Sequence, residues 1–219
     1  LSTDQVAGLG TASVAAMSTA QVAALTSDQV AVLGSTQISA LSAKQVAVLS
    51  TANVAALTTT QVGALNSKTI AALTTAQIGA LTTEQAEALT TTQVAGLSTV
   101  ALGALSTDQL ATFSTADVAA INAKALAGLS TTNFAALSTD QVAALTTGQI
   151  AGLKTTQIAA LTSDQAVALT TAQAAVLSAT QAVAITTANL AALSTDQVAA
   201  LNTKAVNALT TAQIGALTT

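Results

Sequence analysis

The sequence contains no cysteine, histidine, proline, tryptophan or tyrosine. Without cysteine there is neither a disulfide framework nor information on redox compartment. Without cysteine and histidine, a thiolate or imidazole metal site cannot form, and neither can a nucleophile–histidine pair. The absence of proline also removes the residue that most often interrupts a regular array. We therefore predict that the chain is not an enzyme, with no catalytic residues, no metal site and no cofactor.

Charge is scarce as well, with 6% charged residues, a net charge of −4 and only five basic residues. A protein that binds nucleic acid needs a basic patch to neutralise phosphates, so we expect no nucleic-acid partner. Hydrophobic residues make up 51% of the chain. This combination is the reverse of the low hydrophobicity and high charge that keep a chain disordered.

Mean hydropathy is high, at +0.64, but the apolar residues occur in short runs such as residues 22–25, separated by Ser, Thr, Gln or Asp. A membrane-spanning helix needs about 20 consecutive apolar residues, so no membrane span is predicted. No signal peptide is visible, and the chain begins at Leu1 without a methionine. We expect it to be a processed or excised piece of a longer protein.

A large apolar residue recurs at every eighth position from Leu1 to Leu217. Of these 28 positions 24 are Leu, and the others are Met17, Phe113, Ile121 and Ile185. Nothing interrupts the period, so residues 1–219 are predicted to form a single continuous array of 27 octads followed by residues 217–219. A strict short period indicates a repeat architecture, in which one small unit stacks on copies of itself.

The consensus octad is Leu-[Ser/Thr]-Thr-x-Gln-Val-Ala-Ala, with positions numbered one to eight from the Leu. Position two is Ser or Thr in 21 of 27 octads, and position five is Gln in 18. Ser or Thr followed three residues later by Gln is the capping box of a helix N-terminus, and the Leu and Val then form its hydrophobic staple. Each octad is therefore predicted to start a new helix. Lys154 is the one unfavourable residue at position two.

One continuous helix does not fit, because a period of eight residues drifts off any fixed face of a 3.6-residue helix. Strands are an alternative, since Thr, Val and Ile favour them, but Val-Ala-Ala-Leu is a contiguous block rather than an alternation. Helices this short are unstable alone. The fold class predicted is thus an all-α solenoid of very short N-capped helices, one per octad. The small residues at positions seven and eight are expected to allow close approach of the layers.

Charged residues at position four follow a slower rhythm. The acids fall in octads 1, 4, 11, 14, 18, 21 and 25, as Asp4, Asp28, Glu84, Asp108, Asp140, Asp164 and Asp196. Alternating intervals of three and four predict a superhelix with roughly 3.4 octads per turn and the acids along one edge. Lysines at position four (Lys44, Lys68, Lys124, Lys204) share the rhythm and would lie on another edge. Recent duplication of octads is an alternative origin for both patterns.

Few residues suggest a binding site. Glu84 and Glu87 lie three apart, on one helical face, and are expected to be solvated acids rather than a cation site. Weak Ca²⁺ binding by the acidic edge lacks the six to eight converging oxygens of a tight site. Position three is Thr in 20 of 27 octads, a regular array similar to those of ice-binding proteins. Ice binding is therefore one functional alternative, and a scaffold that binds a protein partner is another.

Octads such as Leu-Thr-Thr-Ala-Gln-Ile-Gly-Ala at residues 73–80 resemble the Ala/Leu/Thr/Gln-rich octapeptide-repeat tracts of very large bacterial surface or secreted proteins. That resemblance implies an extracellular or cell-surface location and a structural protein, namely a filament, stalk or matrix rod. The array starts and ends in repeat phase, without atypical polar end octads, so we expect head-to-tail fibres or a longer parent chain. No small-molecule substrate is expected.

Overall fold

The structure, a computed structural model, describes residues 1–217. That part of the chain holds 27 helices of four to six residues, one in each octad, and no strand. The all-helical prediction is therefore confirmed and the strand alternative is wrong. The chain divides into two compact units, Leu1–Phe113 and Ser114–Thr219.

The helices of the first unit are α1 (Thr3–Ala7), α2 (Thr11–Ala15), α3 (Thr19–Ala23), α4 (Ser27–Ala31), α5 (Ser35–Ser39), α6 (Ala43–Val46), α7 (Thr51–Ala55), α8 (Thr59–Ala64), α9 (Ser67–Ala71), α10 (Thr75–Gly79), α11 (Thr83–Glu87), α12 (Thr91–Ala95), α13 (Thr99–Gly103) and α14 (Thr107–Ala111). Those of the second unit are α15 (Thr115–Ala120), α16 (Ala123–Leu126), α17 (Thr131–Ala135), α18 (Thr139–Ala144), α19 (Thr147–Ala151), α20 (Thr155–Ala159), α21 (Ser163–Ala168), α22 (Thr171–Ala175), α23 (Ala179–Ala184), α24 (Thr187–Ala192), α25 (Thr195–Ala200), α26 (Thr203–Ala208) and α27 (Thr211–Ala216).

Every helix begins after position two, as predicted. At α1, the backbone of Ser2 is extended and its hydroxyl accepts a hydrogen bond from the Gln5 amide at 3.2 Å. The Gln5 side chain in turn accepts from the Ser2 amide at 2.8 Å, which completes the capping box. A side-chain cap is missing only at Gly10, Gly34 and Lys154 among the described helices. Each extended cap residue also stops the preceding helix from continuing.

The helix ends are tightened by a bond from the next position-one residue, as from the Leu9 amide to the Val6 carbonyl at 3.1 Å. This three-residue bond uses one lone pair of a carbonyl that has no partner further along its own helix. No residue in the described range has a positive φ. The turns between octads therefore need no left-handed glycine, and glycines are not required to end the helices.

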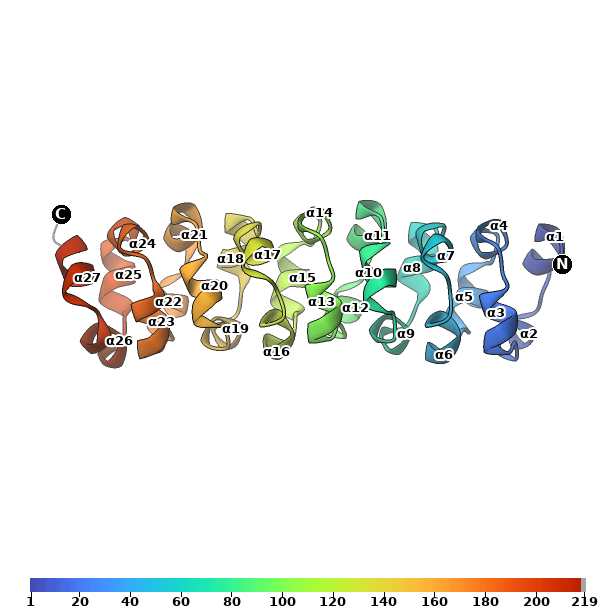
Figure 1. Ribbon diagram of the computed structural model, residues 1–219, viewed down its shortest axis with the longest axis horizontal. Coiled ribbons are helices and arrows are strands. Elements are labelled where there is room, and N and C mark those ends of the chain that lie inside the picture. The colour runs from blue at the N-terminus through green and yellow to red at the C-terminus, as the bar shows by residue number, and fades with distance from the viewer. Residues whose placement is uncertain (218–219) are drawn as a thin grey trace. The chain divides into compact units, whose positions relative to one another are not determined.

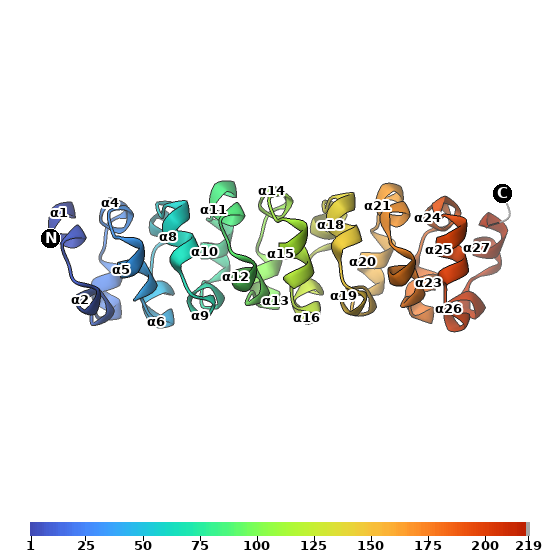
Figure 2. The same ribbon diagram turned by 180° about the vertical axis from the view of Figure 1, so that it is seen from behind.

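Within each unit, every helix packs on the helix three octads later, from α1 on α4 to α11 on α14, and from α15 on α18 to α24 on α27. We call one turn of this superhelix a layer. Figure 1 shows successive helices winding around each unit, and Figure 2 shows the same winding from behind. The core consists of the position-one and position-six side chains, such as Leu57 and Val62. Burial of one such side chain stabilises the fold by about 1.5–3 kcal/mol.

The acid-bearing helices of the first unit, α1, α4, α11 and α14, lie along one edge in both views, while α6 and α9, which carry lysines, lie along the opposite edge (Figures 1 and 2). This supports the predicted charge edges in that unit. In the second unit α18 packs on α21, so Asp140 and Asp164 belong to stacked helices. The placement of Asp196 on the same edge stays a prediction.

Close approach through small residues holds at one position in particular. A Cβ atom added at Gly96 would lie 3.3 Å from the Ser67 Cβ of the preceding layer, which is tighter than ordinary contact. At Gly63 and Gly79 an added Cβ would make ordinary contacts at 3.6 and 3.7 Å, and at Gly215 it would meet nothing within 4 Å. The expectation is therefore confirmed for Gly96, whereas alanine fits at the other three positions.

The uncapped N-terminus of α20 gives a stability test. We expect Lys154→Ser to raise the free energy of unfolding by about 0.5–2 kcal/mol, because the new hydroxyl would accept the Gln157 amide. Urea unfolding followed by circular dichroism measures the change. Lys204→Ser is the matched control, since it removes the same charge from an exposed position of α26 without adding a cap. Equal effects of the two substitutions would contradict the capping explanation.

Candidate functional site

The two acids singled out by spacing do not form a site. Glu84 and Glu87 are both exposed on α11. A hydrogen bond with its own backbone amide lowers the pKa of Glu84, as do bonds from the Thr82 and Thr83 hydroxyls. Its charged form is thus held by local contacts at the start of the helix. Within residues 1–217, no group of three or more acidic, histidine or cysteine side chains is placed to hold a metal ion.

The polar groups that the fold does bury are the position-five amides, and Gln77 is representative. Its backbone amide donates to the Thr74 hydroxyl at 3.2 Å, and its Oε1 accepts from the Thr74 amide at 2.8 Å. These two bonds cap the start of α10. They also fix the side chain so that the remaining donor, Nε2, points towards the preceding layer.

In the preceding layer, Nε2 of Gln77 donates to the carbonyl oxygens of Val46 and Leu49, at 2.9 and 2.7 Å. Both carbonyls belong to the end of α6, four helices earlier, although α10 packs on α7. A helix is therefore stacked on its third predecessor and hydrogen-bonded to its fourth. One turn thus contains between three and four octads, which agrees with the predicted value of roughly 3.4.

We call the hydrogen bond from a position-five amide to the carbonyl 28 residues earlier the interlayer amide bond. Glutamine makes it at 2.5–3.2 Å at Gln29, Gln37, Gln45, Gln61, Gln77, Gln85, Gln93 and Gln109 in the first unit, and at Gln149, Gln157, Gln165, Gln173, Gln181, Gln197 and Gln213 in the second. Each bond joins the start of one helix to the end of another. Among the described residues, no buried side-chain nitrogen or oxygen lacks a partner.

Asparagine at position five makes the same bond with an added partner. Nδ2 of Asn53 donates to the Leu25 carbonyl at 2.9 Å, while its Oδ1 accepts from the Ser27 hydroxyl at 3.2 Å. Asn189 is held in the same way by Leu161 and Ser163. Because asparagine is one methylene shorter, its oxygen bonds across the layer instead of completing the capping box.

Position two replaces the missing amide where position five is Ala205. Oδ1 of Asn202 caps α26 by accepting from the Ala205 amide at 3.0 Å. Its Nδ2 donates to the carbonyls of Ala175 and Leu177, at 2.9 and 2.7 Å. Leu177 lies 28 residues before Ala205, so its carbonyl is the one that a glutamine at 205 would reach. Asn202 is thus both a helix cap and an interlayer donor.

The interlayer role of these amides was missed by the sequence reasoning, which treated Gln as a capping residue and Asn202 as a simple cap. One regularity could have revealed it. Asparagine occupies position two only in octads whose position five is not an amide, with the pairs Asn66 and Thr69, Asn122 and Ala125, and Asn202 and Ala205. Chemically, a neutral amide neither transfers a proton nor attacks a substrate at ordinary pH. The arrangement therefore ties layers together.

Removal of one interlayer amide tests its contribution. We expect Gln77→Ala to lower the free energy of unfolding by about 2–4 kcal/mol more than Gln21→Ala, because it leaves two buried carbonyls without this donor, at about 1–3 kcal/mol each. Gln21 is the matched control, since it completes the same capping box at 2.8 and 3.2 Å but is exposed. Urea unfolding measures both. Equal losses would mean that only the cap matters.

The replacement at Asn202 allows a rescue experiment. Asn202→Ser keeps a helix cap but loses the donor to Leu177, so we expect a loss of about 1–3 kcal/mol in the free energy of unfolding. Adding Ala205→Gln in the same chain should restore most of that stability, because glutamine supplies the donor from position five. Thermal and urea unfolding of the single and double variants measure this. A double variant less stable than Asn202→Ser would show that the two positions are not equivalent.

Comparison with known proteins agrees with this octad chemistry. The ALTTAQ repeat matches seven segments, residues 1–35, 30–67, 54–91, 87–115, 110–147, 147–179 and 182–219. No curated protein matches the chain. The matched segments cover all residues except 180 and 181. The chain is therefore a member of the ALTTAQ repeat family.

Proposed function

We propose that this solenoid repeat protein is purely structural, a segment of an extracellular filament, stalk or matrix rod in which the octads act as one array without catalysis. The observation that carries the proposal is the regular recurrence of the interlayer amide bond. Fifteen glutamines use the same donor and the same class of acceptor. Buried polar groups elsewhere often form binding sites, whereas here they hold successive layers together.

The hollows of the surface also favour a structural role. The one of about 530 Å³ beside α26 is lined by Val176, Leu177, Ser178, Asn202 and Lys204, among others. The amide of Asn202 is already bonded to the backbone of the preceding layer. A small-molecule site normally combines an enclosed apolar pocket with several free polar groups. This hollow offers few such groups, so we propose no small-molecule substrate.

Ice binding has less support than a structural role. Most position-three threonines are exposed, as an ice-binding face requires. However, consecutive octads occupy successive places around the superhelical turn (Figure 1). The threonines are therefore distributed around each unit instead of gathering on one flat face. The low charge of the surface likewise gives no basic footprint for nucleic acid.

The extracellular location rests on the resemblance to tracts of large bacterial surface and secreted proteins. No helix within residues 1–217 is long and apolar enough to cross a membrane.

The location and the structural role can be tested on the cells that produce the protein. An antibody against the chain should label intact cells or their surrounding matrix as strongly as permeabilised cells, and electron microscopy should show the label on rods, stalks or fibres. A cytoplasmic protein of the same cells is the control, since it should be labelled only after permeabilisation. Labelling that requires permeabilisation would contradict the extracellular proposal.

A further inference from the structure

The two sides of a layer differ in their chemistry. Position-one side chains are buried only where a layer precedes them, so Leu1 is 73% exposed whereas Leu33 is 4% exposed. Position-six side chains are buried only where a layer follows, so Ile214 is 43% exposed whereas Val6 is 1% exposed. Each layer thus presents position-one side chains to its predecessor and position-six side chains to its successor.

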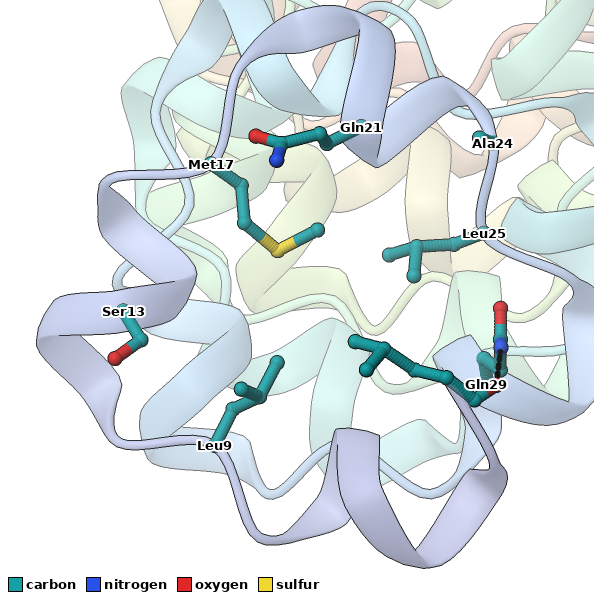
Figure 3. A pocket seen from close by; sticks show the side chains of 8 residues that line it. Leu9, Ser13, Met17, Gln21, Ala24, Leu25 and Gln29 are labelled. Atoms are coloured by element: carbon teal, nitrogen blue, oxygen red, sulfur yellow. Dashed lines mark hydrogen bonds between the residues drawn. The ribbon is translucent and has the colours of Figure 1, made fainter.

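The side that would face a predecessor is hollow in the α1–α4 layer. Figure 3 shows Leu9, Met17 and Leu25 around the hollow, with Gln21 and Gln29 at its margin. Its volume is about 410 Å³. We call this surface the receiving face.

The receiving face also carries hydrogen-bond donors. Gln5 and Gln21 are exposed there, and their Oε1 atoms already accept from the Ser2 and Ser18 amides, both at 2.8 Å. Within residues 1–217, no acceptor is found for the Nε2 donors of these two side chains. Their counterparts in later layers, such as Gln77, donate to carbonyls of the preceding layer.

The opposite side is presented by α25, α26 and α27. Val206 and Ile214 are exposed at position six, and Val198 is half-buried. The carbonyl oxygens of Leu193 and Leu209 belong to the class that accepts interlayer amide bonds in other octads, and no donor to either is found within the described residues. We call this surface the donating face, because its apolar side chains would enter the receiving face.

We propose that the receiving face of one chain binds the donating face of a second copy, so that copies join head to tail. The proposal rests on the structural role proposed above and specifies its joint. Continuing the repeat register across the joint pairs Gln5 of one copy with Leu193 of the other, and Gln21 with Leu209, at the 28-residue spacing that recurs within both units. Donors meet acceptors, and apolar side chains meet an apolar hollow.

A second copy is the occupant that this surface fits best, because both halves of the contact are the two sides of an interface already formed many times inside each unit. In the continued register, Leu1 and Leu217 hold the same position of the octad. One of them therefore leaves that position on docking. Such a contact is heterologous, and since each copy keeps one free face of each kind, association continues into fibres.

The experiment uses the 219-residue chain and two variants that each block one face. Leu9→Asp places a carboxylate in the receiving face, and Ile214→Asp places one on the donating face. Burying an unpaired carboxylate is costly, so we expect each variant to associate at least about tenfold more weakly than the original chain. Val100→Asp is the matched control, because Val100 is an exposed position-four side chain on α13. It should associate like the original chain.

Analytical ultracentrifugation over a range of concentrations, with electron microscopy, gives the readout, and circular dichroism confirms that each variant is folded. The original chain should form species that lengthen with concentration. An equimolar mixture of Leu9→Asp and Ile214→Asp should form dimers that grow no further, since each variant keeps one competent face.

Three results would overturn the proposed joint. They are an original chain that stays monomeric at all concentrations, an Ile214→Asp variant that still forms long species, and a Val100→Asp variant that loses association as strongly as Ile214→Asp. None of these bears on the antibody labelling of cells, which tests the extracellular structural role separately.

Discussion

The ends of very short helices are the constraint on which this structure depends. A helix leaves four amides at its start and four carbonyls at its end without intrahelical partners, and a five-residue helix therefore consists almost entirely of ends. Ser or Thr at position two satisfies an amide locally, and the next Leu amide uses part of one carbonyl. The remaining carbonyl capacity is used by a glutamine from the following layer. The helices are thus stable only as a stack.

Local features of the fold were predictable from the sequence because they lie within a few residues of each other. The capping box of Ser2 and Gln5 spans three residues, and one octad contains all of it. The interlayer amide bond joins residues 28 apart. A pattern with a period of eight fits every earlier octad equally well, so the octad itself does not say which carbonyl Gln77 reaches. The charge rhythm gave the turn independently, because surface charges follow the edges of the superhelix.

The exceptions to the consensus are understandable once the interlayer bond is known. Asn53 loses the reciprocal half of the capping box but gains Ser27 across the layer. Asn202 supplies from position two the donor that Ala205 lacks. Lys154 forfeits its side-chain cap, yet its amide still donates to Gln157 at 3.0 Å, and Gln157 still bonds to the preceding layer. The interlayer donor is therefore retained in octads where other parts of the consensus are lost.

The uniformity of the interlayer contact has a genetic consequence. Gain or loss of a whole octad by slippage in the coding DNA changes which octads face each other, but every octad offers the same donor and the same acceptor. Such a length variant keeps its core. A frame-preserving insertion of a single residue, in contrast, displaces a capping residue from its glutamine and breaks the turn locally. Matched pairs such as Ser27 and Asn53 would be the casualties of slippage between them, and so they mark segments whose length is less free to vary.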